Sequence, residues 1–294
     1  MRNVFFEKLK EEMRSDKRIF LVVADMGLGL VEPVKKEFPE RYINVGIAEQ
    51  NMIGVSAGLC NAGFRPVCYT ISNFLVHRCF EQIRNDVCLH NYPVTLVGTS
   101  TGFDNGRLGP THHVIDDIGC LKILPGMRIY SPTSVAAIRM VFKDVMETES
   151  PAYVRIGKGA LSIDNAGDKI NHMVVSNPNA DTLLITHGNM LEDCVKAARI
   201  NARLAVYAMN KILPLDRDEL DRIFSIYSRI VVVEDHLAGS GLYNTLCQYA
   251  VESEKGRAKL CVIAPPDCYE DRIGDRNYFA SKYGFTPEQI AKNL

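Results

Sequence analysis

The sequence has little that would suit it to a nucleic acid, a membrane or an oxidising compartment. Its formal net charge is -1, and no basic cluster carries interleaved aromatic side chains, so nothing favours a polyanion. No apolar run approaches the ~20 residues of a membrane helix. The 9 cysteines include no C-x-x-C pair, which is typical of free thiols in a reducing compartment. We therefore expect a cytoplasmic protein that binds neither nucleic acid nor a membrane.

What the sequence does contain is an ordinary globular composition. Of its 294 residues, 47% are apolar and 23% are charged, which is typical of a globular protein with room for two domains. The first 14 residues mix apolar and charged side chains. This pattern predicts an amphipathic helix rather than a signal peptide, which needs an uninterrupted apolar stretch.

Short apolar, β-branched runs alternate with amphipathic segments of helical length. In the first half, the runs that predict strands lie at 19–24, 65–70, 94–97, 128–130 and 152–156. The predicted helices between them lie at 49–62, 75–89 and 134–147. Strands that are apolar throughout and separated by helices are typical of a mostly parallel sheet covered on both faces.

The alternation stops in a stretch rich in Gly, Asn, Asp and Lys, and then resumes. Strands are expected at 182–186, 204–208, 230–234 and 259–264, with helices at 191–201, 216–227 and 242–251 and a last helix capped by Thr286. The sequence therefore predicts the α/β class, as two consecutive domains with parallel or mixed sheets. We place them at residues 1–160 and 181–294, joined by a linker at 161–180.

Several short motifs follow one another through the first domain. They lie at residues 45–51, 63–67, 72–75, 81–87, 109–113 and 124–127, followed by Ser131-Pro132 and Arg155. In order and spacing they closely resemble the pyrimidine-binding domain of the transketolase and 1-deoxyxylulose-phosphate synthase families. The run Glu234-Asp235-His236 before Gly239 resembles the C-terminal domain of the same enzymes. The resemblance implies a thiamine-diphosphate pyrimidine-binding fold followed by a transketolase C-terminal domain.

Glu49 is the residue to which the resemblance assigns the central role. It stands where the helix after a short strand begins, and by position alone a glutamate there only complements the helix dipole. In the family, the matching carboxyl group hydrogen-bonds a ring nitrogen of the cofactor's aminopyrimidine and so promotes loss of the proton at thiazolium C2. The cofactor supplies the carbanion chemistry, and the protein supplies orientation. The resemblance thus makes Glu49 both a catalytic and a cofactor-binding residue.

Three further side chains are implied for the aminopyrimidine pocket. Phe74 and Phe80 match aromatic positions that pack against the ring. Six residues apart, they fall about 120° out of line on an ideal helix, so the backbone must bend or one side chain must reach round. His77 stands at a position that is aromatic in many transketolases, and it either stacks on the ring or hydrogen-bonds elsewhere.

Two adjacent histidines are implied for the substrate. His112 matches the histidine that faces the substrate hydroxyls in the family, where an imidazole polarises a carbonyl or transfers protons. His113 follows it, as in the 1-deoxyxylulose-phosphate synthases. Adjacent histidines usually point apart, so we expect only one of the two to touch substrate, and His112 is the catalytic candidate.

The substrate-binding positions depart from the family pattern. Leu108 replaces an aspartate that recognises a sugar hydroxyl, and Ser100 replaces a phosphate-binding histidine. Arg155 matches the phosphate-binding arginine, although a lone arginine in a strand is as often a structural ion pair. Arg107 is a possible new anion contact. Each lost hydrogen bond to a buried hydroxyl costs about 1–3 kcal/mol, so we expect a modified, differently configured or less phosphorylated substrate.

The Gly-Asp-Gly motif, through which these enzymes hold Mg²⁺ and the cofactor diphosphate, does not occur in the sequence. The residues before Ile19 are too few for another domain, so we expect a partner subunit to carry that motif. The resemblance implies a β-type subunit of an α₂β₂ enzyme that uses thiamine diphosphate and Mg²⁺, with no metal ligand from this chain.

Ketol transfer between sugar-like substrates is the favoured reaction. The alternatives are a decarboxylative carboligase that resembles 1-deoxyxylulose-phosphate synthase, or the β subunit of a 2-oxo-acid dehydrogenase. A non-catalytic scaffold that completes an oligomer is the alternative of another class.

Overall fold

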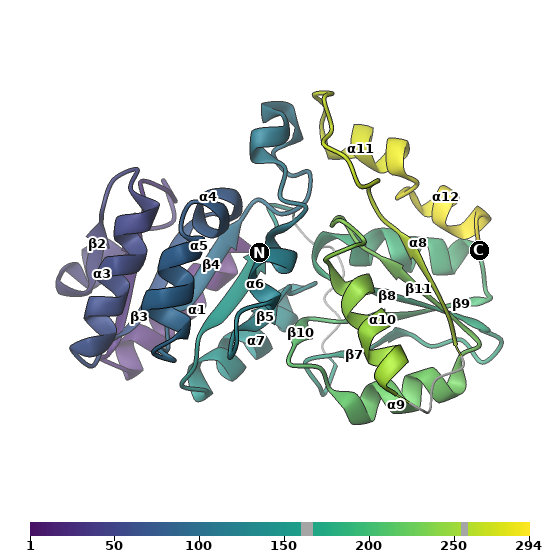
Figure 1. Ribbon diagram of the computed structural model, residues 1–294, viewed down its shortest axis with the longest axis horizontal. Helices are drawn as coiled ribbons and strands as arrows, with labels where there is room; N and C mark the ends of the chain where they lie inside the picture. The colour runs from purple at the N-terminus through teal and green to yellow at the C-terminus, as the bar shows by residue number, and fades with distance from the viewer. Residues whose placement is uncertain (160–166, 254–257) are drawn as a thin grey trace.

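The computed structural model describes residues 1–159, 167–253 and 258–294, and Figure 1 shows it as two α/β units side by side. Each unit is built on one sheet, of 7 and 5 strands. The prediction of two consecutive α/β domains with mostly parallel sheets is therefore confirmed.

The first sheet has the strand order β10-β5-β6-β4-β3-β1-β2. All of its strands except β10 run parallel to their neighbours. These strands are β1 (Ile19–Val23), β2 (Tyr42–Asn44), β3 (Arg65–Ile71), β4 (Thr95–Thr99), β5 (Arg128–Tyr130) and β6 (Ala152–Ile156). Because the carboxyl ends of parallel strands lie at one edge, the loops that follow β1 to β4 gather there.

Helices cover both faces of the first sheet, because its strands send alternate side chains to each face. Leu21 of β1 packs with α1 (Arg2–Ser15) and α7 (Val135–Glu147). Its neighbour Val22 packs on the opposite face with the following helices. They are α3 (Glu49–Asn61), α4 (Ser72–His77), α5 (Phe80–Gln82), the π-helix η2 (Ile83–Cys88) and α6 (Asp117–Lys122).

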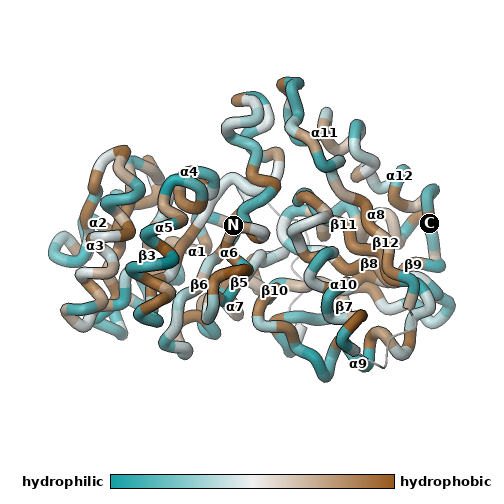
Figure 2. The backbone as a smooth tube through the Cα atoms, in the orientation of Figure 1, coloured by the Kyte–Doolittle hydropathy of each residue, from teal (hydrophilic) through white to brown (hydrophobic). Residues whose placement is uncertain are grey.

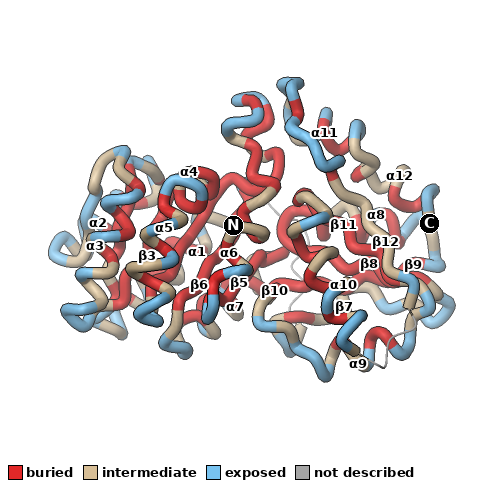
Figure 3. Tube along the Cα trace, viewed as in Figure 1, coloured by how far each residue is buried: buried red, intermediate tan, exposed pale blue. Residues whose placement is uncertain are grey.

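The second sheet has the order β12-β11-β8-β9-β7. Its strands are β7 (His172–Val175), β8 (Thr182–Thr186), β9 (Leu204–Ala208), β11 (Arg229–Val233) and β12 (Lys259–Ile263). One face packs with α8 (Leu191–Ile200), α11 (Arg276–Tyr283) and α12 (Pro287–Lys292), and the other with α9 (Arg217–Ile226) and α10 (Leu242–Glu252). Figures 2 and 3 show the inner strands of each sheet as the apolar, buried centre of its unit.

Two edge strands differ from the sequence-based expectation. β7 lies within the linker expected at 161–180 and pairs antiparallel with β9, while residues 160–166 lie outside the described part of the chain. β10 (Lys211–Leu213) comes from the second half of the chain but pairs antiparallel with β5 of the first sheet. Both strands are very short, so they leave almost no periodic signal.

The helix expected at 75–89 is interrupted. α4 ends at His77, and the chain leaves helical geometry at Cys79 (φ -110°, ψ 10°) before α5 and η2 continue. This break lies between Phe74 and Phe80, where the sequence implied either a bend in the backbone or a side chain that reaches round. Across the described residues, no helix combines the length and apolarity that a membrane span requires.

Candidate active site

The turn between β2 and α3 fixes Glu49 at the carboxyl edge of the first sheet. Asn44 Oδ1 accepts hydrogen bonds from the backbone N–H groups of Gly46 and Asp25, both at 3.0 Å. Gly46 has φ +76°, a left-handed conformation that glycine adopts without steric cost. The chain then enters α3 with Glu49 as its first residue, and only 4% of that residue is exposed. The sequence thus places a nearly buried carboxylate at a helix N-terminus.

The partner of this carboxylate is Arg78, which the sequence analysis did not single out. Arg78 Nη1 donates to Glu49 Oε2 at 3.0 Å. The same guanidinium lies over the ring of Phe74, with its central carbon 3.9 Å from the ring centroid. Phe74 belongs to α4, which follows β3 directly. Arg78 therefore joins the carboxylate of one strand–helix turn to the aromatic ring of the next.

Phe80 is found away from the cavity at this edge. It lies beyond the break after α4 and is half-buried against the core that α3 and η2 share. Phe74 instead lines the cavity described below. The structure therefore brings Glu49 together with Phe74 and leaves Phe80 in a packing role.

His77 makes a hydrogen bond instead of presenting a free ring. Its Nε2 lies 3.0 Å from Asp116 Oδ1, and its Nδ1 lies 3.8 Å from the Cys120 sulfur. The hydrogen bond to Asp116, followed by that to Cys120, raises the pKa of His77 to about 10. The hydrogen bond to Asp116 therefore favours the protonated imidazole. The sequence left open whether His77 stacks on the cofactor ring or hydrogen-bonds elsewhere. In this structure of the chain alone, His77 is hydrogen-bonded.

A short turn holds His112 against Phe74. Asn73 Nδ2 donates to the carbonyls of Thr111 at 3.0 Å and of His113 at 2.7 Å, and this ties the turn to α4. The His112 ring then lies edge-on to Phe74 with the ring centroids 5.3 Å apart. Because Asn73 and Phe74 are adjacent, one segment fixes both the aromatic ring and the imidazole beside it.

His113 points the other way, as expected for adjacent histidines. Its ring packs edge-on against Phe103 and Phe279, with centroids 5.1 and 5.2 Å away. Its Nε2 lies 3.4 Å from the carbonyl of Gly106. Burial lowers the pKa of His113, so the ring is neutral at physiological pH. This histidine links the first domain to α11 of the second.

A cavity of about 310 Å³ opens at this edge, between the two domains. Its walls from the first domain combine an aromatic ring, cations and an acid, namely Phe74, His77, Arg78, His113 and Asp116. The second domain adds Tyr269 and Glu270 from the loop before α11, which rises beside the first domain in Figure 1. A flat, nitrogen-bearing ring that stacks on Phe74 and forms a hydrogen bond with a carboxyl group suits this chemistry.

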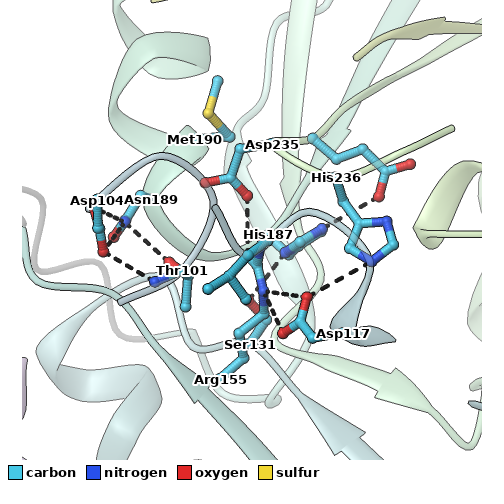
Figure 4. Close-up of polar contacts among 12 residues, drawn as sticks. Thr101, Asp104, Asp117, Ser131, Arg155, His187, Asn189, Met190, Asp235 and His236 are labelled. Carbon is cyan, nitrogen blue, oxygen red and sulfur yellow. Dashed lines mark hydrogen bonds and ion pairs between the residues drawn. The ribbon is translucent and has the colours of Figure 1, made fainter. Parts of the chain in front are cut away.

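Arg155 requires a correction. Its side chain is fully buried, and it pairs with Asp117 (Nε to Oδ2, 3.0 Å) and with Asp235 (Nη1 to Oδ1, 3.0 Å). Figure 4 shows the guanidinium between these carboxylates, among the side chains that join the two domains. Each charge is compensated inside the protein, as a buried ion pair requires. Arg155 is thus a structural ion pair, and the substrate-phosphate role implied by the resemblance does not fit this geometry.

None of the three remaining substrate candidates lines the cavity. Ser100 is fully buried with φ +69°, and its Oγ has no hydrogen-bond partner among the described residues. The Arg107 side chain is 78% exposed and pairs with Asp275 at 3.1 Å. Leu108 is 59% exposed. The structure therefore does not gather these three side chains around one ligand-sized space.

Comparisons with known proteins agree with this architecture. The family model of the transketolase pyrimidine binding domain matches residues 1–163, and that of the transketolase C-terminal domain matches residues 171–290. The chain is 30% identical to 1-deoxy-D-xylulose-5-phosphate synthase 1 of Geobacter metallireducens, over 99% of this chain and 48% of that protein. It is 29% identical to one subunit of the apulose-4-phosphate transketolase of Phocaeicola vulgatus, over 99% and 95%.

Among solved structures, a split-gene transketolase in an inactive β4 tetramer superposes with a TM-score of 0.85. It is 25% identical and covers 99% of this chain and 95% of that one. The chain spans about half the length of the first curated relatives it matches. Both domains of the match occur in the order that the motifs predicted. The chain therefore belongs to the transketolase family, as its pyrimidine-binding and C-terminal sections.

Proposed function

We propose that this chain is the β-type subunit of a thiamine-diphosphate-dependent enzyme that transfers a two-carbon ketol unit between sugar-like substrates. The observation that carries the proposal is Glu49, a 4% exposed carboxylate at the start of α3, joined through Arg78 to the face of Phe74. Relatives named as transketolase subunits and as 1-deoxy-D-xylulose-5-phosphate synthases support it.

The residues present fit the aminopyrimidine of the cofactor. Arg78 demonstrates that a planar N–H donor can contact Glu49 Oε2 and cover Phe74 at the same time. When bound, the cofactor would supply the nucleophilic carbon on which the ketol unit is carried. Glu49 would hold a proton at its carboxyl group and Phe74 would orient the ring. His77, which Asp116 holds by a hydrogen bond, would lie beside them.

His112 is the residue that we assign to the substrate. Its ring is placed edge-on to Phe74 by the turn that Asn73 holds, so it adjoins the proposed cofactor position. An imidazole there can donate to a carbonyl oxygen or move a proton. His113 lines the cavity but packs against Phe103 and Phe279, and would act by positioning this turn.

The diphosphate and Mg²⁺ are assigned to a partner. Among residues 1–159, 167–253 and 258–294, no group of three His, Cys, Asp or Glu side chains converges as a metal site. Mg²⁺ takes oxygen ligands, usually one or two carboxylates together with phosphate oxygens, and in the related enzymes a Gly-Asp-Gly motif supplies them. We assign these ligands to an N-terminal-section subunit that carries Gly-Asp-Gly, in an α₂β₂ assembly.

The surface beside Glu49 suits such a partner. Leu28 is 94% exposed and Ile47 is 77% exposed. Because β1 and β2 are parallel neighbours, the loops that carry these residues leave the sheet at the same edge. Large apolar side chains gathered next to a site are typical of an interface.

The substrate is proposed to lack the phosphate that transketolase substrates usually present, or to carry it elsewhere. Arg155 is committed to Asp117 and Asp235, and Ser100 is buried. The exposed Arg107 remains as an anion contact if Asp275 releases it. A decarboxylative reaction is a second candidate, favoured by the 30% identity to a 1-deoxy-D-xylulose-5-phosphate synthase.

Reconstitution tests the proposal. The chain would be combined with a Gly-Asp-Gly subunit from the same cell, thiamine diphosphate and Mg²⁺, and screened with ketose and 2-oxo-acid donors against aldehyde acceptors. We expect ketol transfer without CO₂ release, and less turnover of xylulose 5-phosphate than of a non-phosphorylated or modified ketose. Release of CO₂ from a 2-oxo acid would favour the decarboxylative reaction, and efficient standard transketolase kinetics would contradict the substrate assignment.

A further inference from the structure

Arg78 is bound to the two groups that the proposed function reserves for the cofactor. Its Nη1 donates to Glu49 Oε2 at 3.0 Å, and its central carbon lies 3.9 Å from the centroid of Phe74. A guanidinium is planar, stacks on aromatic faces and presents a row of N–H donors. An aminopyrimidine is also flat, and one of its ring nitrogens is the implied hydrogen-bond partner of the Glu49 carboxyl group. The two groups therefore need the same carboxylate and the same ring face.

We propose that Arg78 is an internal occupant of the aminopyrimidine site, which holds Glu49 and Phe74 in place until the cofactor displaces it. This inference rests on the proposed function, because it takes these two residues as the aminopyrimidine contacts. A buried carboxylate without a partner is costly, and Glu49 is 4% exposed. Arg78 compensates that charge in the chain on its own.

The position of Arg78 suits a group that has to leave. Its side chain is 49% exposed, whereas that of Arg155 is 0% exposed and lies between Asp117 and Asp235. Arg78 also directly follows the last residue of α4, at the break before α5. The guanidinium can therefore turn into solvent by rotation about its own side-chain bonds, while the backbone that carries Phe74 keeps its place.

Displacement has a measurable consequence for affinity. The cofactor must compete with a half-exposed ion pair and a cation–π contact. The apparent dissociation constant is therefore the intrinsic one divided by the fraction of molecules in which Arg78 has left the site. Contacts of these two kinds together correspond to about a fivefold to tenfold change in a dissociation constant. Removing the guanidinium should recover that factor.

The test uses the complex of this chain with the Gly-Asp-Gly subunit, because the proposed function places the diphosphate and Mg²⁺ ligands on that partner. Binding of thiamine diphosphate with Mg²⁺ to the complex is measured by titration calorimetry. Arg78→Met removes the charge and keeps the aliphatic stem, while Arg78→Lys keeps the charge and loses the planar fork. Arg84→Met is the matched control, because Arg84 is exposed and bonded to Asn85. We expect Arg78→Met to bind about fivefold to tenfold more tightly than wild type, Arg78→Lys to fall between them, and Arg84→Met to equal wild type.

Equal or weaker binding by both Arg78 variants would overturn the inference, because Arg78 would then be neutral or a contact of the bound cofactor. Circular dichroism checks that Arg78→Met folds, and Arg78→Lys carries the test if it does not. Adding Glu49→Gln to Arg78→Met tests the proposed aminopyrimidine site separately from the displacement of Arg78. A clear loss of binding supports the proposed site whatever Arg78 does, whereas binding that this change leaves untouched, or no binding by any variant, would overturn the proposed function and the inference together.

Discussion

The two sheets of this protein use their carboxyl edges in opposite ways. At the edge of the first sheet, Phe74 and Arg78 line a cavity of about 310 Å³, and Glu49 contacts Arg78. At the edge of the second sheet, His187 follows β8 and Glu234 follows β11, and both are fully buried. We call these the open edge and the closed edge.

The closed edge is covered by the first domain. His187 Nδ1 lies 3.0 Å from Ser131 Oγ, and Asp235 binds Arg155 at 3.0 Å. Figure 4 shows these side chains facing one another across the junction of the domains. Polar groups at this position of an α/β sheet usually mark a ligand site. Here the polar groups of the closed edge bind the first domain, whereas those of the open edge remain available to a ligand.

Glu49→Gln should break the open edge functionally and have the largest effect. A positioned group that exchanges a proton contributes about 10²–10⁴-fold to rate, and glutamine cannot hold that proton. We expect kcat of the reconstituted enzyme to fall by a factor in this range, with the melting temperature nearly unchanged. An unchanged rate would favour a non-catalytic scaffold.

Arg155→Met should break the closed edge structurally. It leaves Asp117 and Asp235 as buried carboxylates without their cation, a change that costs about 3–5 kcal/mol. Urea unfolding followed by circular dichroism measures the loss in free energy of unfolding. Arg107→Met is the matched control, because its ion pair with Asp275 is exposed and is worth about 0–1 kcal/mol. Equal losses in the two variants would contradict the structural role of Arg155.

His112→Asn should sharpen the description of the open edge with a smaller effect. Loss of one hydrogen bond to a substrate oxygen costs about 1–3 kcal/mol, so kcat/KM should fall by roughly tenfold to a hundredfold. His113→Asn is the comparison, since His113 faces Phe103 and Phe279. His113→Asn should lower the free energy of unfolding more than it lowers kcat/KM. The assignment of substrate contact to His112 fails if only the His113 variant alters KM in a folded enzyme.

The smallest expected effect is a pH dependence at the open edge. The pKa of His77 is raised from 6.5 to about 10 by Asp116 and Cys120. A raised pKa stabilises the folded state fully below pH 6.5 and loses that effect as the pH rises toward 10. Because the pair is about one-third exposed, it should contribute at most about 1 kcal/mol. The difference in unfolding free energy between wild type and Asp116→Asn should shrink from pH 6 to pH 9, and a constant difference would contradict the pair.

Much of the fold is readable from the sequence because its signals are local. The runs that form β1, β8 and β9 are short and mostly apolar, and they were predicted within one residue of their bounds. Ser134 and Thr286 cap their helices through hydrogen bonds to residues three positions on. β10 could not be predicted, because it pairs with a strand about 80 residues earlier in the chain.

The site was readable only in part for the same reason. The position of Glu49 at the start of α3 follows from a local strand–turn–helix pattern. Its contact with Arg78 joins two separate turns of the fold, and the pairing of Arg155 with Asp117 and Asp235 joins two domains. Whether an arginine meets a ligand or a carboxylate depends on such distant partners, which local sequence does not encode.

The most direct test of the account is the exchange of the proton at thiazolium C2 of thiamine diphosphate bound to the reconstituted complex, followed by NMR in D₂O. The account predicts that the wild-type complex exchanges this proton far faster than the free cofactor does. It also predicts that the Glu49→Gln complex, at a cofactor concentration that saturates its weakened site, loses most of the acceleration. Equal exchange rates in the wild-type and Glu49→Gln complexes would contradict the claim that the open edge of this chain activates the cofactor.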